Sequence, residues 1–410
     1  MKKYVVIGNG TAAVGCIEGI RSVEREGAIT VISEEAHHVY SRPLISYYLE
    51  GKTDLERIKY RRDGFYEENG CAFMPGVKAV SIDPEGKRVA LEDGSTVEYD
   101  ALCVATGSRP FVPPFEGLDT VGKKFSFMTL DDALALEEAL APDARVLIVG
   151  AGLIGLKCAE GIAERAGSIT VCDLADRVLS SILDAECAEV VQRHLEEHGI
   201  KFMLGDSAAR FDGDRAYMKS GAEVDFDVLV LAVGVRANTE LVKEIGGEVG
   251  RGIVIDDKMA TSIPGIFAAG DCAEGYDASI GAKRVLAILP NAYFQGHAAG
   301  VNMAGGDESF NSAIPMNSIG FFGLHIMTAG AYDGEMIDGG ADGSIHRLFV
   351  KDGRLDGFML IGDTQRAGIY TGLIRERTPL DTLDFELTKK IASNMIFSPE
   401  TRRKKFGGVV

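Results

Sequence analysis

The chain has 410 residues, 46% of them hydrophobic and 25% charged, which is the composition of a soluble globular protein with two or three domains. Its formal net charge of −18 argues against nucleic-acid binding, because a phosphate backbone requires a surface rich in lysine and arginine. The seven cysteines contain no CxxC pair, which argues against a disulfide framework, a cysteine zinc site or an iron–sulfur cluster and favours a reducing cytoplasm. No apolar run approaches a membrane span, and the one near the N-terminus is too short for a signal peptide.

Residues 2–35 read as a strand, a glycine turn, a helix, a second strand and an acid. In the loop "GNGTAA", the first glycine suits a tight turn, the second allows a pyrophosphate to approach the backbone, and the small third residue allows close helix packing. The helix that follows would direct its N-terminus at the phosphates. These features predict a dinucleotide site rather than a plain βαβ unit, with contacts from Gly8, Gly10, Ala13, Glu34 and Glu35.

The same pattern returns at residues 145–173, around "GAGLIG". Asp173 ends the second strand of this unit, where a carboxylate accepts a hydrogen bond from the adenosine 2′-hydroxyl and repels a 2′-phosphate. NADH is therefore expected rather than NADPH, although Arg177 leaves NADPH open. Two such units predict two dinucleotides with hydride passing between them, and the second would be bound by Gly150, Gly152, Ile154, Gly155 and Asp173.

Other apolar strands end in small or acidic residues, and such strand ends converge on the ligand crevice of α/β proteins. From about Ser309 the pattern changes to short strands with glycine-rich turns, followed by helices, which predicts an α+β domain. The expected fold is α/β, with two doubly wound Rossmann-like domains and this C-terminal domain. The strand ends are Ala105, Thr106 and Gly107, then Ala232 to Gly234, then Gly270 and Asp271.

The motifs "GNGTAA", "YSRPLISYYLEG", "ATGSRP", "GAGLIG", "AVGVRAN", "GIFAAGDCAE" and "NAYFQGHAAG" occur in this order. In this set the chain resembles the pyridine-nucleotide flavoprotein reductases of the glutathione-reductase fold. Within them it is most similar to NADH:rubredoxin reductases, the flavin module of NADH-dependent nitrite reductases, and ferredoxin reductases. The resemblance implies an FAD domain at 1–113 and 242–308, an NAD domain at 114–241, and a C-terminal domain at 309–410.

The resemblance also assigns roles to single residues. Arg42 would lie along the flavin nucleotide, Ala79 would offer its backbone to the adenine, and Asp271 would accept a bond from a ribitol hydroxyl. A helix starting near Asn291, with Pro290 before it, would point at the flavin pyrimidine edge and stabilise negative charge there. The set of expected cofactor contacts is completed by Ala105, Thr106, Gly107, Gly234 and Gly270.

Disulfide reductases of this fold carry redox cysteines beside the flavin, but the corresponding stretch "HHVYSRPLISYYLEGK" contains none. Cys16 and Cys71 are expected in the core, and Cys272 could approach the flavin but has no resolving partner in the sequence. Electrons are therefore expected to leave from the flavin itself.

In many relatives a lysine and a glutamate pair beside flavin N5. Here Tyr47 stands at the lysine position and Lys157 at the glutamate position. Lys157 could extend to solvent, but its position after the third glycine favours a catalytic role near N5 together with Tyr47. Because a buried lone lysine is costly, we expect it to contact Tyr47, an acid or the cofactor.

Two further motifs have a simpler interpretation. His194 and His198 are one helical turn apart, but without an H-E-x-x-H pattern they favour a helix C-terminus over a metal site, and no metal is expected. The basic C-terminal stretch "TRRKKFGGVV" favours a solvated tail, with docking of an acidic carrier as the alternative.

The sequence thus predicts a cytoplasmic, FAD-dependent NADH oxidoreductase. Its expected partner is a small electron carrier, either rubredoxin or ferredoxin or an iron–sulfur subunit, and a homodimer is compatible with this function. Neither nucleic acid nor a membrane is expected as a partner. An NADH oxidase and a redox-sensing flavoprotein scaffold are the alternatives.

Overall fold

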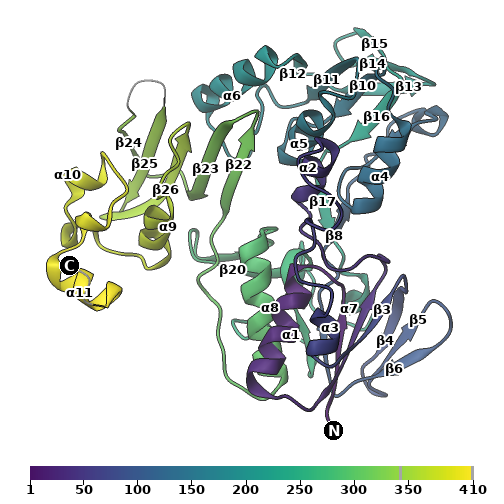
Figure 1. The fold of residues 1–410 in the computed structure, drawn as a ribbon, viewed down its shortest axis with the longest axis vertical. Helices are drawn as coiled ribbons and strands as arrows, with labels where there is room; N and C mark the ends of the chain where they lie inside the picture. The colour runs from purple at the N-terminus through teal and green to yellow at the C-terminus, as the bar shows by residue number, and fades with distance from the viewer. Residues whose placement is uncertain (341–343, 408–410) are drawn as a thin grey trace.

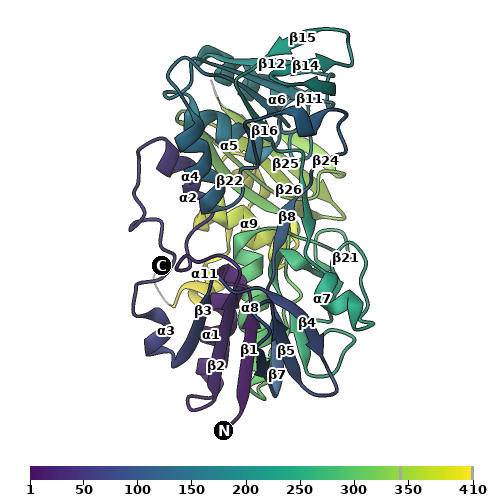
Figure 2. The ribbon, with the colours of Figure 1, turned by 90° about the vertical axis from the view of Figure 1, so that its right-hand side faces the viewer.

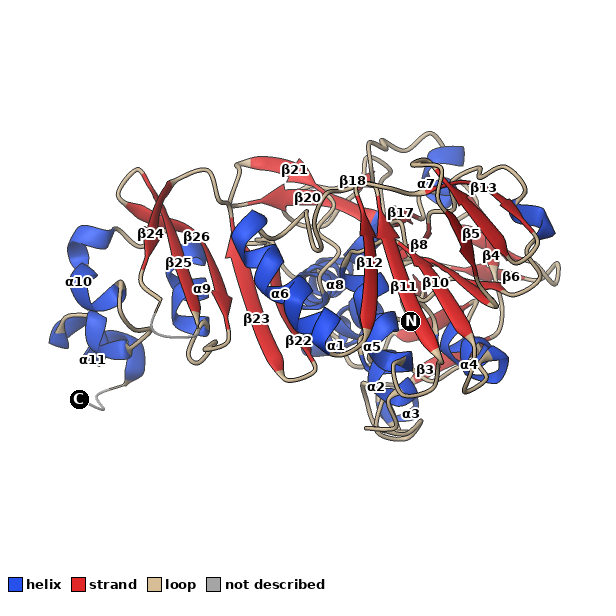
Figure 3. Cartoon of the chain, turned by 90° about the horizontal axis from the view of Figure 1, so that it is seen from above, coloured by secondary structure: helices blue, strands red, loops and turns tan. Residues whose placement is uncertain are grey.

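The computed structural model describes residues 1–340 and 344–407. Figure 1 shows the glycine-rich N-terminal unit at the lower right, the second glycine unit above it, and the C-terminal sheet and helices at the left. Turned by 90°, the two glycine units lie one above the other along the long axis (Figure 2). The C-terminal part forms one end of the molecule when it is seen from above (Figure 3).

The N-terminal unit is built on a parallel five-stranded sheet in the order β19-β7-β1-β2-β3. Ile7 pairs with Ile32 on one side and Val104 on the other, so three strands end level with the first glycine turn. Strand β19, which is distant in the sequence from the other four strands, extends this sheet at the edge beside β7. Segments that are far apart in the sequence therefore share one core. The bounds are β1 Lys3–Ile7, β2 Ala28–Ser33, β3 Cys71–Pro75, β7 Ala101–Val104 and β19 Ile266–Ala268.

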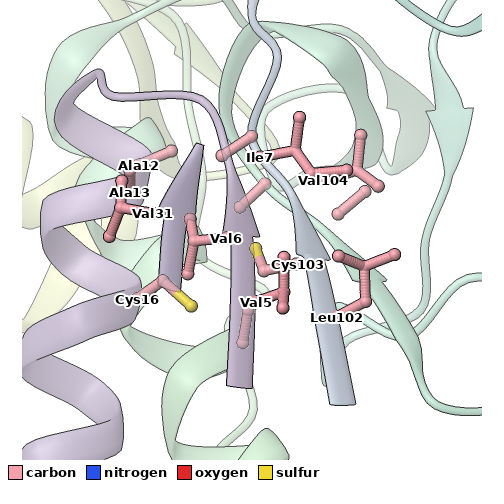
Figure 4. Packing of buried hydrophobic residues seen from close by; sticks show 14 of the residues in the cluster. Val5, Val6, Ile7, Ala12, Ala13, Cys16, Val31, Leu102, Cys103 and Val104 are labelled. Atoms are coloured by element: carbon pink, nitrogen blue, oxygen red, sulfur yellow. The ribbon is translucent and has the colours of Figure 1, made fainter. Parts of the chain in front are cut away.

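Helices α1, Thr11–Val23, and α8, Leu289–Met303, pack on each other beside this sheet. Their backbones approach through glycines: a Cβ on Gly15 would lie 2.2 Å from the Tyr293 carbonyl oxygen, and one on Gly296 would lie 2.0 Å from that of Ala12. Figure 4 shows Ala13 and Cys16 of α1 beside the buried side chains of β1 and β7. The segment 289–303 is thereby fixed against the first glycine unit.

The second unit has the same design, with a parallel sheet in the order β12-β11-β10-β16-β9 and an antiparallel sheet β13-β14-β15 beside it. The strands are β9 Lys124–Phe125, β10 Arg145–Val149, β11 Ser168–Asp173, β12 Ile200–Leu204, β13 Ala208–Asp212, β14 Arg215–Met218, β15 Glu223–Asp225 and β16 Val228–Leu231. The helices are α4 Leu130–Ala139, α5 Leu153–Ile162 and α6 Ala185–Glu197.

Shorter strands and helices complete the two glycine units and the connections between them. The strands are β4 Ala79–Asp83, β5 Arg88–Leu91, β6 Thr96–Glu98, β8 Ser108–Pro110, β17 Val235–Ala237, β18 Ile253–Val254, β20 Ala273–Asp277 and β21 Ala282–Arg284. The helices are α2 Leu44–Leu49, α3 Phe65–Glu68 and α7 Glu240–Glu244. The 3-10 turns are Leu118–Thr120, Gly270–Cys272, Leu380–Thr382 and Asn394–Ile396.

The C-terminal part is an antiparallel sheet in the order β22-β23-β26-β25-β24 with helices packed against it. The buried Arg347 joins it to the second unit, because its guanidinium donates to Asp184 at 2.5 Å and also to Glu186 at the start of α6. The bounds are β22 Met316–Phe321, β23 Leu324–Gly330, β24 Glu335–Asp338, β25 Ile345–Lys351, β26 Arg354–Ile361, α9 Gly368–Arg375, α10 Phe385–Thr388 and α11 Pro399–Phe406.

The α/β fold predicted from the sequence is confirmed. Helix α8 begins at Leu289, two residues before the expected start, because Pro290 occupies the first helical turn instead of preceding it. Across residues 1–340 and 344–407, no helix is both long and apolar enough to cross a membrane.

Candidate active site

A cavity of about 810 Å³ opens at the carboxyl ends of β1, β2 and β7. This volume lies in the range of about 300–1,000 Å³ that is typical of ligand pockets. Its wall is formed by residues of eight segments, namely 7–12, 77–80, 105–110, 269–271 and parts of 32–42, 128–131, 238–244 and 289–292. The cavity therefore depends on segments within residues 7–131 and 238–292, which flank the second glycine turn in the sequence and include the start of α8.

The first glycine turn forms the floor of this cavity. Gly8 has φ +117°, and a Cβ there would lie 2.0 Å from the Ala105 carbonyl oxygen, so only glycine fits. A Cβ on Gly10 would meet nothing within 4 Å, so the space in front of this residue is open. Gly10 caps α1 without a side-chain hydrogen bond, which leaves first-turn N–H groups available to a phosphate. The turn fits the pyrophosphate for which it was predicted, and Ala13 is fully buried behind it.

The two acids at the end of β2 line the cavity and are held by side chains from other segments. Glu34 forms an ion pair with Lys78 at 2.8 Å. Glu35 accepts a hydrogen bond from the Arg42 guanidinium and one from the Tyr40 hydroxyl at 2.5 Å. Both carboxylates are thus positioned at the cavity rim.

Asp271 lies in the cavity wall, where the Ser108 hydroxyl donates to its carboxylate at 3.3 Å. Burial raises the pKa of the Asp271 carboxyl above its usual range, while the Arg42 charge and the Ser108 hydroxyl oppose this shift. A half-buried carboxylate with spare acceptor capacity suits a hydroxyl donor of a ligand, as expected for a ribitol.

The other residues predicted for the first nucleotide divide into two groups. Most line the cavity, but Pro290 and Asn291 do not, although their neighbours Leu289 and Ala292 do. The Asn291 amide instead donates to the Ile314 carbonyl at 3.1 Å, and its Oδ1 has no partner within the described residues. The remaining lining residues are Ala79, Ala105, Thr106, Gly107 and Gly270.

Two cavity residues in quoted motifs were not singled out from the sequence. Asn238 of "AVGVRAN" donates to the Thr106 carbonyl at 2.8 Å, and its own carbonyl accepts from the Thr106 hydroxyl at 2.9 Å. The hydroxyl of Tyr40 in "YSRP" donates to Glu35 and accepts a hydrogen bond from the Leu130 N–H at 2.9 Å. Their positions within the motifs were the only signal in the sequence.

The second glycine turn repeats the first. Gly150 has φ +119°, and a Cβ there would lie 2.3 Å from the Ala232 carbonyl oxygen. A Cβ on Gly152 would meet nothing within 4 Å, whereas one on Gly155 would lie 2.0 Å from the Gly150 carbonyl oxygen. Gly152 caps α5 without a side-chain bond, so this helix also offers its first N–H groups to an anion.

Asp173 ends β11 and is held by the backbone of its own unit. Its carboxylate accepts from the Ala151 N–H at 2.7 Å and from the Ala175 N–H at 2.8 Å, so it lies directly beside the glycine turn. The Arg177 guanidinium donates to Asp176 at 2.9 Å and to the Leu183 carbonyl at 3.3 Å. This arginine is already engaged on its own loop. Ile154 is half-buried in the first turn of α5, and Gly234 accepts from the Phe111 N–H at 2.9 Å beyond β16.

Lys157 lies where α5, α2 and the end of β22 meet. It forms an ion pair with the buried Glu160 and donates to the Gly320 carbonyl at 3.3 Å. Its Nζ lies 4.5 Å from the centre of the Tyr47 ring and 5.7 Å from that of Phe321. The lysine therefore has both an acid and Tyr47 as partners. Neither Lys157 nor Tyr47 belongs to the cavity wall, although α2 begins two residues after Arg42.

The cysteines are free, and all but the half-buried Cys71 are buried. Burial raises the pKa of Cys71 to about 12 and that of Cys272 to about 11, which disfavours the reactive thiolate. The Cys272 thiol lies 3.3 Å from the Val104 carbonyl and outside the cavity wall. This arrangement offers no thiol chemistry at the cavity.

The two histidines of α6 lie at its C-terminal end. His194 Nε2 lies 2.9 Å from the Phe321 carbonyl oxygen, and the His198 ring stacks on Phe322 with centroids 4.3 Å apart. Within the described part of the chain, no three histidine, cysteine, aspartate or glutamate side chains are arranged to hold a metal. The basic stretch 401–406 forms part of α11, and residues 408–410 of the tail lie outside the described residues.

The family description "Pyridine nucleotide-disulphide oxidoreductase" matches residues 2–296, which contain both glycine units. The chain belongs to this family. It is therefore an oxidoreductase that uses a pyridine nucleotide, as the two glycine turns predict.

Curated relatives extend over almost the whole chain. It is 32% identical over 395 residues to the NADH-dependent phenylglyoxylate dehydrogenase subunit epsilon of Aromatoleum evansii, covering 93% of each chain. It is 31% identical to the NADH oxidase of Methanocaldococcus jannaschii, covering 97% of this chain and 94% of that one. It is 30% identical to the rubredoxin-NAD(+) reductase of Pseudomonas putida, covering 73% and 80%.

Among solved structures, the chain resembles the reductase in the covalent putidaredoxin reductase–putidaredoxin complex. The TM-score is 0.88 at 23% identity, covering 96% of this chain and 97% of that one. At this identity, the likeness supports the fold alone.

Proposed function

We propose that the protein binds FAD in the cavity, accepts hydride from NADH bound at the second glycine turn, and passes electrons to a small one-electron carrier in the cytoplasm. The observation that carries the proposal is the repetition of one glycine-turn geometry, at Gly8 and at Gly150, in two separate units. A chain with two dinucleotide sites is suited to hydride transfer between them.

The residues around the cavity bind and orient the first nucleotide. Gly10 and the N-terminus of α1 hold the pyrophosphate, Glu34 and Glu35 accept from the adenosine ribose, and Asp271 accepts from a ribitol hydroxyl. Bound FAD would supply a ring that can accept a hydride and release the two electrons one at a time. Because no proton has to be abstracted from NADH, the chain contributes orientation and electrostatics rather than a general base.

The class of electron acceptor is inferred from the lack of a reactive thiol at the cavity. The described thiols are kept protonated by burial or lie away from the cavity, so a disulfide relay has no residues to use. The Pseudomonas putida relative is named as a rubredoxin reductase, which supports a carrier of the rubredoxin or ferredoxin class. The balanced reaction is NADH plus two oxidised carriers giving NAD⁺, one proton and two reduced carriers.

The first test is flavin content and flavin reduction. The purified protein should be yellow with about one FAD per chain, and NADH should bleach it under argon while NADPH does so much more slowly. A colourless protein, or a flavin that NADH does not bleach, would reject this function.

An NADH oxidase is the second candidate, favoured by the relative from Methanocaldococcus jannaschii. It predicts that air reoxidises the reduced protein as fast as NADH reduces it, without a carrier. The burial of the free thiols argues against an oxidase that uses a reactive cysteine, but not against one in which the flavin itself reduces oxygen.

We further propose that Lys157, with Tyr47, acts beside the reacting ring of the flavin. Helix α2 begins two residues after the cavity residue Arg42, and a Cβ on Gly161 of α5 would lie 3.0 Å from the Ser46 carbonyl oxygen, so α5, which carries Lys157, packs closely on α2. The buried Glu160 fixes the direction of the ammonium group and balances its charge in this half-buried position.

Lys157→Met should slow flavin reduction by NADH about tenfold and lower the flavin potential, because the interaction of a half-buried charge with reduced flavin is lost. Lys157→Arg should restore part of both. Lys52→Met is the matched control, because this lysine also faces the Tyr47 ring, at 5.9 Å, but is exposed. Unchanged rate and potential in Lys157→Met would end the proposal.

A further inference from the structure

Both ends of the hairpin formed by β20 and β21 lie within a few residues of the cavity wall in the sequence. Its first strand begins two residues after Asp271, and four residues separate Arg284 at its end from the cavity residue Leu289. A five-residue strand spans about 17 Å, so the hairpin tip lies within about 20 Å of the cavity wall. In Figure 3 this hairpin extends between the first unit and the C-terminal sheet.

One face of the hairpin is fixed from inside. The Asp277 carboxylate is fully buried, and it accepts from the Arg284 guanidinium at 2.5 Å and from the Ser279 hydroxyl and N–H. The Ala278 carbonyl accepts from Arg377 of the C-terminal domain at 3.5 Å, and the Ala278 N–H donates to the Ala313 carbonyl at 2.8 Å. The hairpin is therefore a preorganised surface.

The opposite face carries exposed apolar and positive groups. Tyr276 and Lys283 pair across the two strands, so their side chains leave the same face. Tyr276 is 41% exposed and Ile280 at the tip is 50% exposed. Lys283 forms no ion pair with any residue that the structure describes, and neither does the exposed Arg377, which adjoins the hairpin from the C-terminal domain through its bond to the Ala278 carbonyl.

This surface contrasts with the chain as a whole, whose formal net charge is −18. An acidic partner is repelled by most of the molecule and attracted where unpaired cations surround apolar side chains. The exposed basic side chains of the cavity wall itself, Lys78 and Arg109, are ion-paired with Glu34 and Glu240. Those of α11 lie in the C-terminal domain, which contributes no residue to the cavity wall. The hairpin combines positive charge, apolar contact area and direct continuity with the cavity.

We infer that Tyr276, Ile280, Lys283 and Arg377 form the docking surface for the acidic one-electron carrier that receives electrons from this protein. The inference rests on the proposed function and adds to it the place and the chemistry of the partner contact. Charge steers the carrier to the hairpin, and the exposed tyrosine and isoleucine supply apolar contact once it arrives.

The test uses Lys283→Glu, Arg377→Glu and the double variant, with Lys219→Glu as a matched control because Lys219 is an exposed lysine of the second unit. An acidic rubredoxin and an acidic [2Fe–2S] ferredoxin serve as carrier probes, and 1,4-benzoquinone serves as a small neutral oxidant. At low salt, the double variant should lower kcat/KM for the carrier at least tenfold, because electrostatic steering changes association rates by about 10–1,000-fold. The difference should shrink as salt rises, and benzoquinone reduction should stay unchanged.

Three results would overturn the inference. The first is a loss of carrier reduction no larger than that of Lys219→Glu. The second is reduction of benzoquinone but of neither carrier by the unmodified protein. The third is a change of oligomeric state in the double variant with carrier reduction unchanged, which would make this face a contact between copies of the chain. Failure of NADH to bleach the flavin in the unmodified protein would instead reject the proposed function itself.

Discussion

The two glycine units share one backbone design but differ in how their sites are enclosed. The first glycine of each unit has a positive φ, +117° at Gly8 and +119° at Gly150, and a Cβ there would collide with a backbone carbonyl oxygen, whereas a Cβ on the second glycine would meet nothing within 4 Å. In both units, an aspartate directly before a neighbouring strand, β7 or β16, binds the start of the strand that leads into the glycine turn, β1 or β10. Asp100 accepts from the Lys3 N–H at 2.7 Å, and Asp227 accepts from the Arg145 N–H at 2.8 Å.

The difference lies in what surrounds each turn. The first is walled by segments from eight regions of the chain, and its acids are held by side chains such as Lys78 and Arg42. The acid of the second, Asp173, is held by the backbone of its own unit. A site enclosed by distant segments suits a resident cofactor, and a self-contained site suits a nucleotide that must enter and leave in each turnover.

The largest expected effect separates the two sites through their first glycines. Gly8→Ala places a Cβ 2.0 Å from a backbone carbonyl at positive φ, and Gly150→Ala does so at 2.3 Å, so each should cost about 3 kcal/mol or more within its own unit. Gly8→Ala should yield protein without flavin. Gly150→Ala should keep its flavin but lose NADH binding, as measured by absorbance and by anaerobic NADH titration. If Gly150→Ala lost the flavin and Gly8→Ala lost NADH binding, FAD would belong to the second glycine turn and NADH to the first.

The next effect concerns how the second unit is anchored. Arg347→Met removes the buried guanidinium that joins the C-terminal sheet to Asp184 and Glu186. The unfolding free energy should fall by about 1–3 kcal/mol, because the two acids left behind are partly exposed. Thermal unfolding of the flavin-bound protein measures this loss, and Arg354→Met, an arginine of the neighbouring strand, is the control. Equal stabilities of the two variants would show that Arg347 is not an anchor.

A smaller effect distinguishes the acids of the two sites. Asp173→Asn should raise KM for NADH about tenfold, or about 1.4 kcal/mol, and should narrow the preference over NADPH. Glu35→Gln should leave both pyridine-nucleotide constants unchanged and should weaken flavin retention instead. Steady-state kinetics with NADH and NADPH, compared with flavin loss on dialysis, make the distinction. An unchanged NADH-to-NADPH ratio in Asp173→Asn would contradict the assignment.

The smallest effect is a pH dependence at the base of the second unit. Hydrogen bonds from the Arg145 side chain and N–H lower the pKa of Asp227 to about 2, below the value of about 3.9 expected for an unfolded chain. The ionised carboxylate therefore contributes stability above about pH 4, and this contribution is lost as the pH falls toward 2. In urea unfolding at pH 5 and pH 3, the deficit of Asp227→Asn should shrink at the lower pH. A deficit that is the same at both values would contradict the shift.

The sequence predicted what is local and could not predict what joins distant segments. Both glycine turns, the acids after them and the strand ends were predictable because strand, turn and helix follow one another within about 35 residues. The Asn238–Thr106 bonds, 132 residues apart, and the anchor of Arg347 on α6 depend on packing that no periodicity encodes. The partners of Lys157 divide the same way: Glu160 is three residues away, whereas Gly320 comes from another domain.

The central claim is that two electrons enter together from NADH and leave singly to a carrier. The most direct measurement mixes the flavin-bound protein under argon with limiting NADH and excess oxidised rubredoxin or ferredoxin, and counts the reduced carriers. Two reduced carriers per NADH, formed faster than oxygen reoxidises the same protein in air, is the predicted result. No carrier reduction, with rapid reoxidation by oxygen alone, would contradict the account and identify an NADH oxidase.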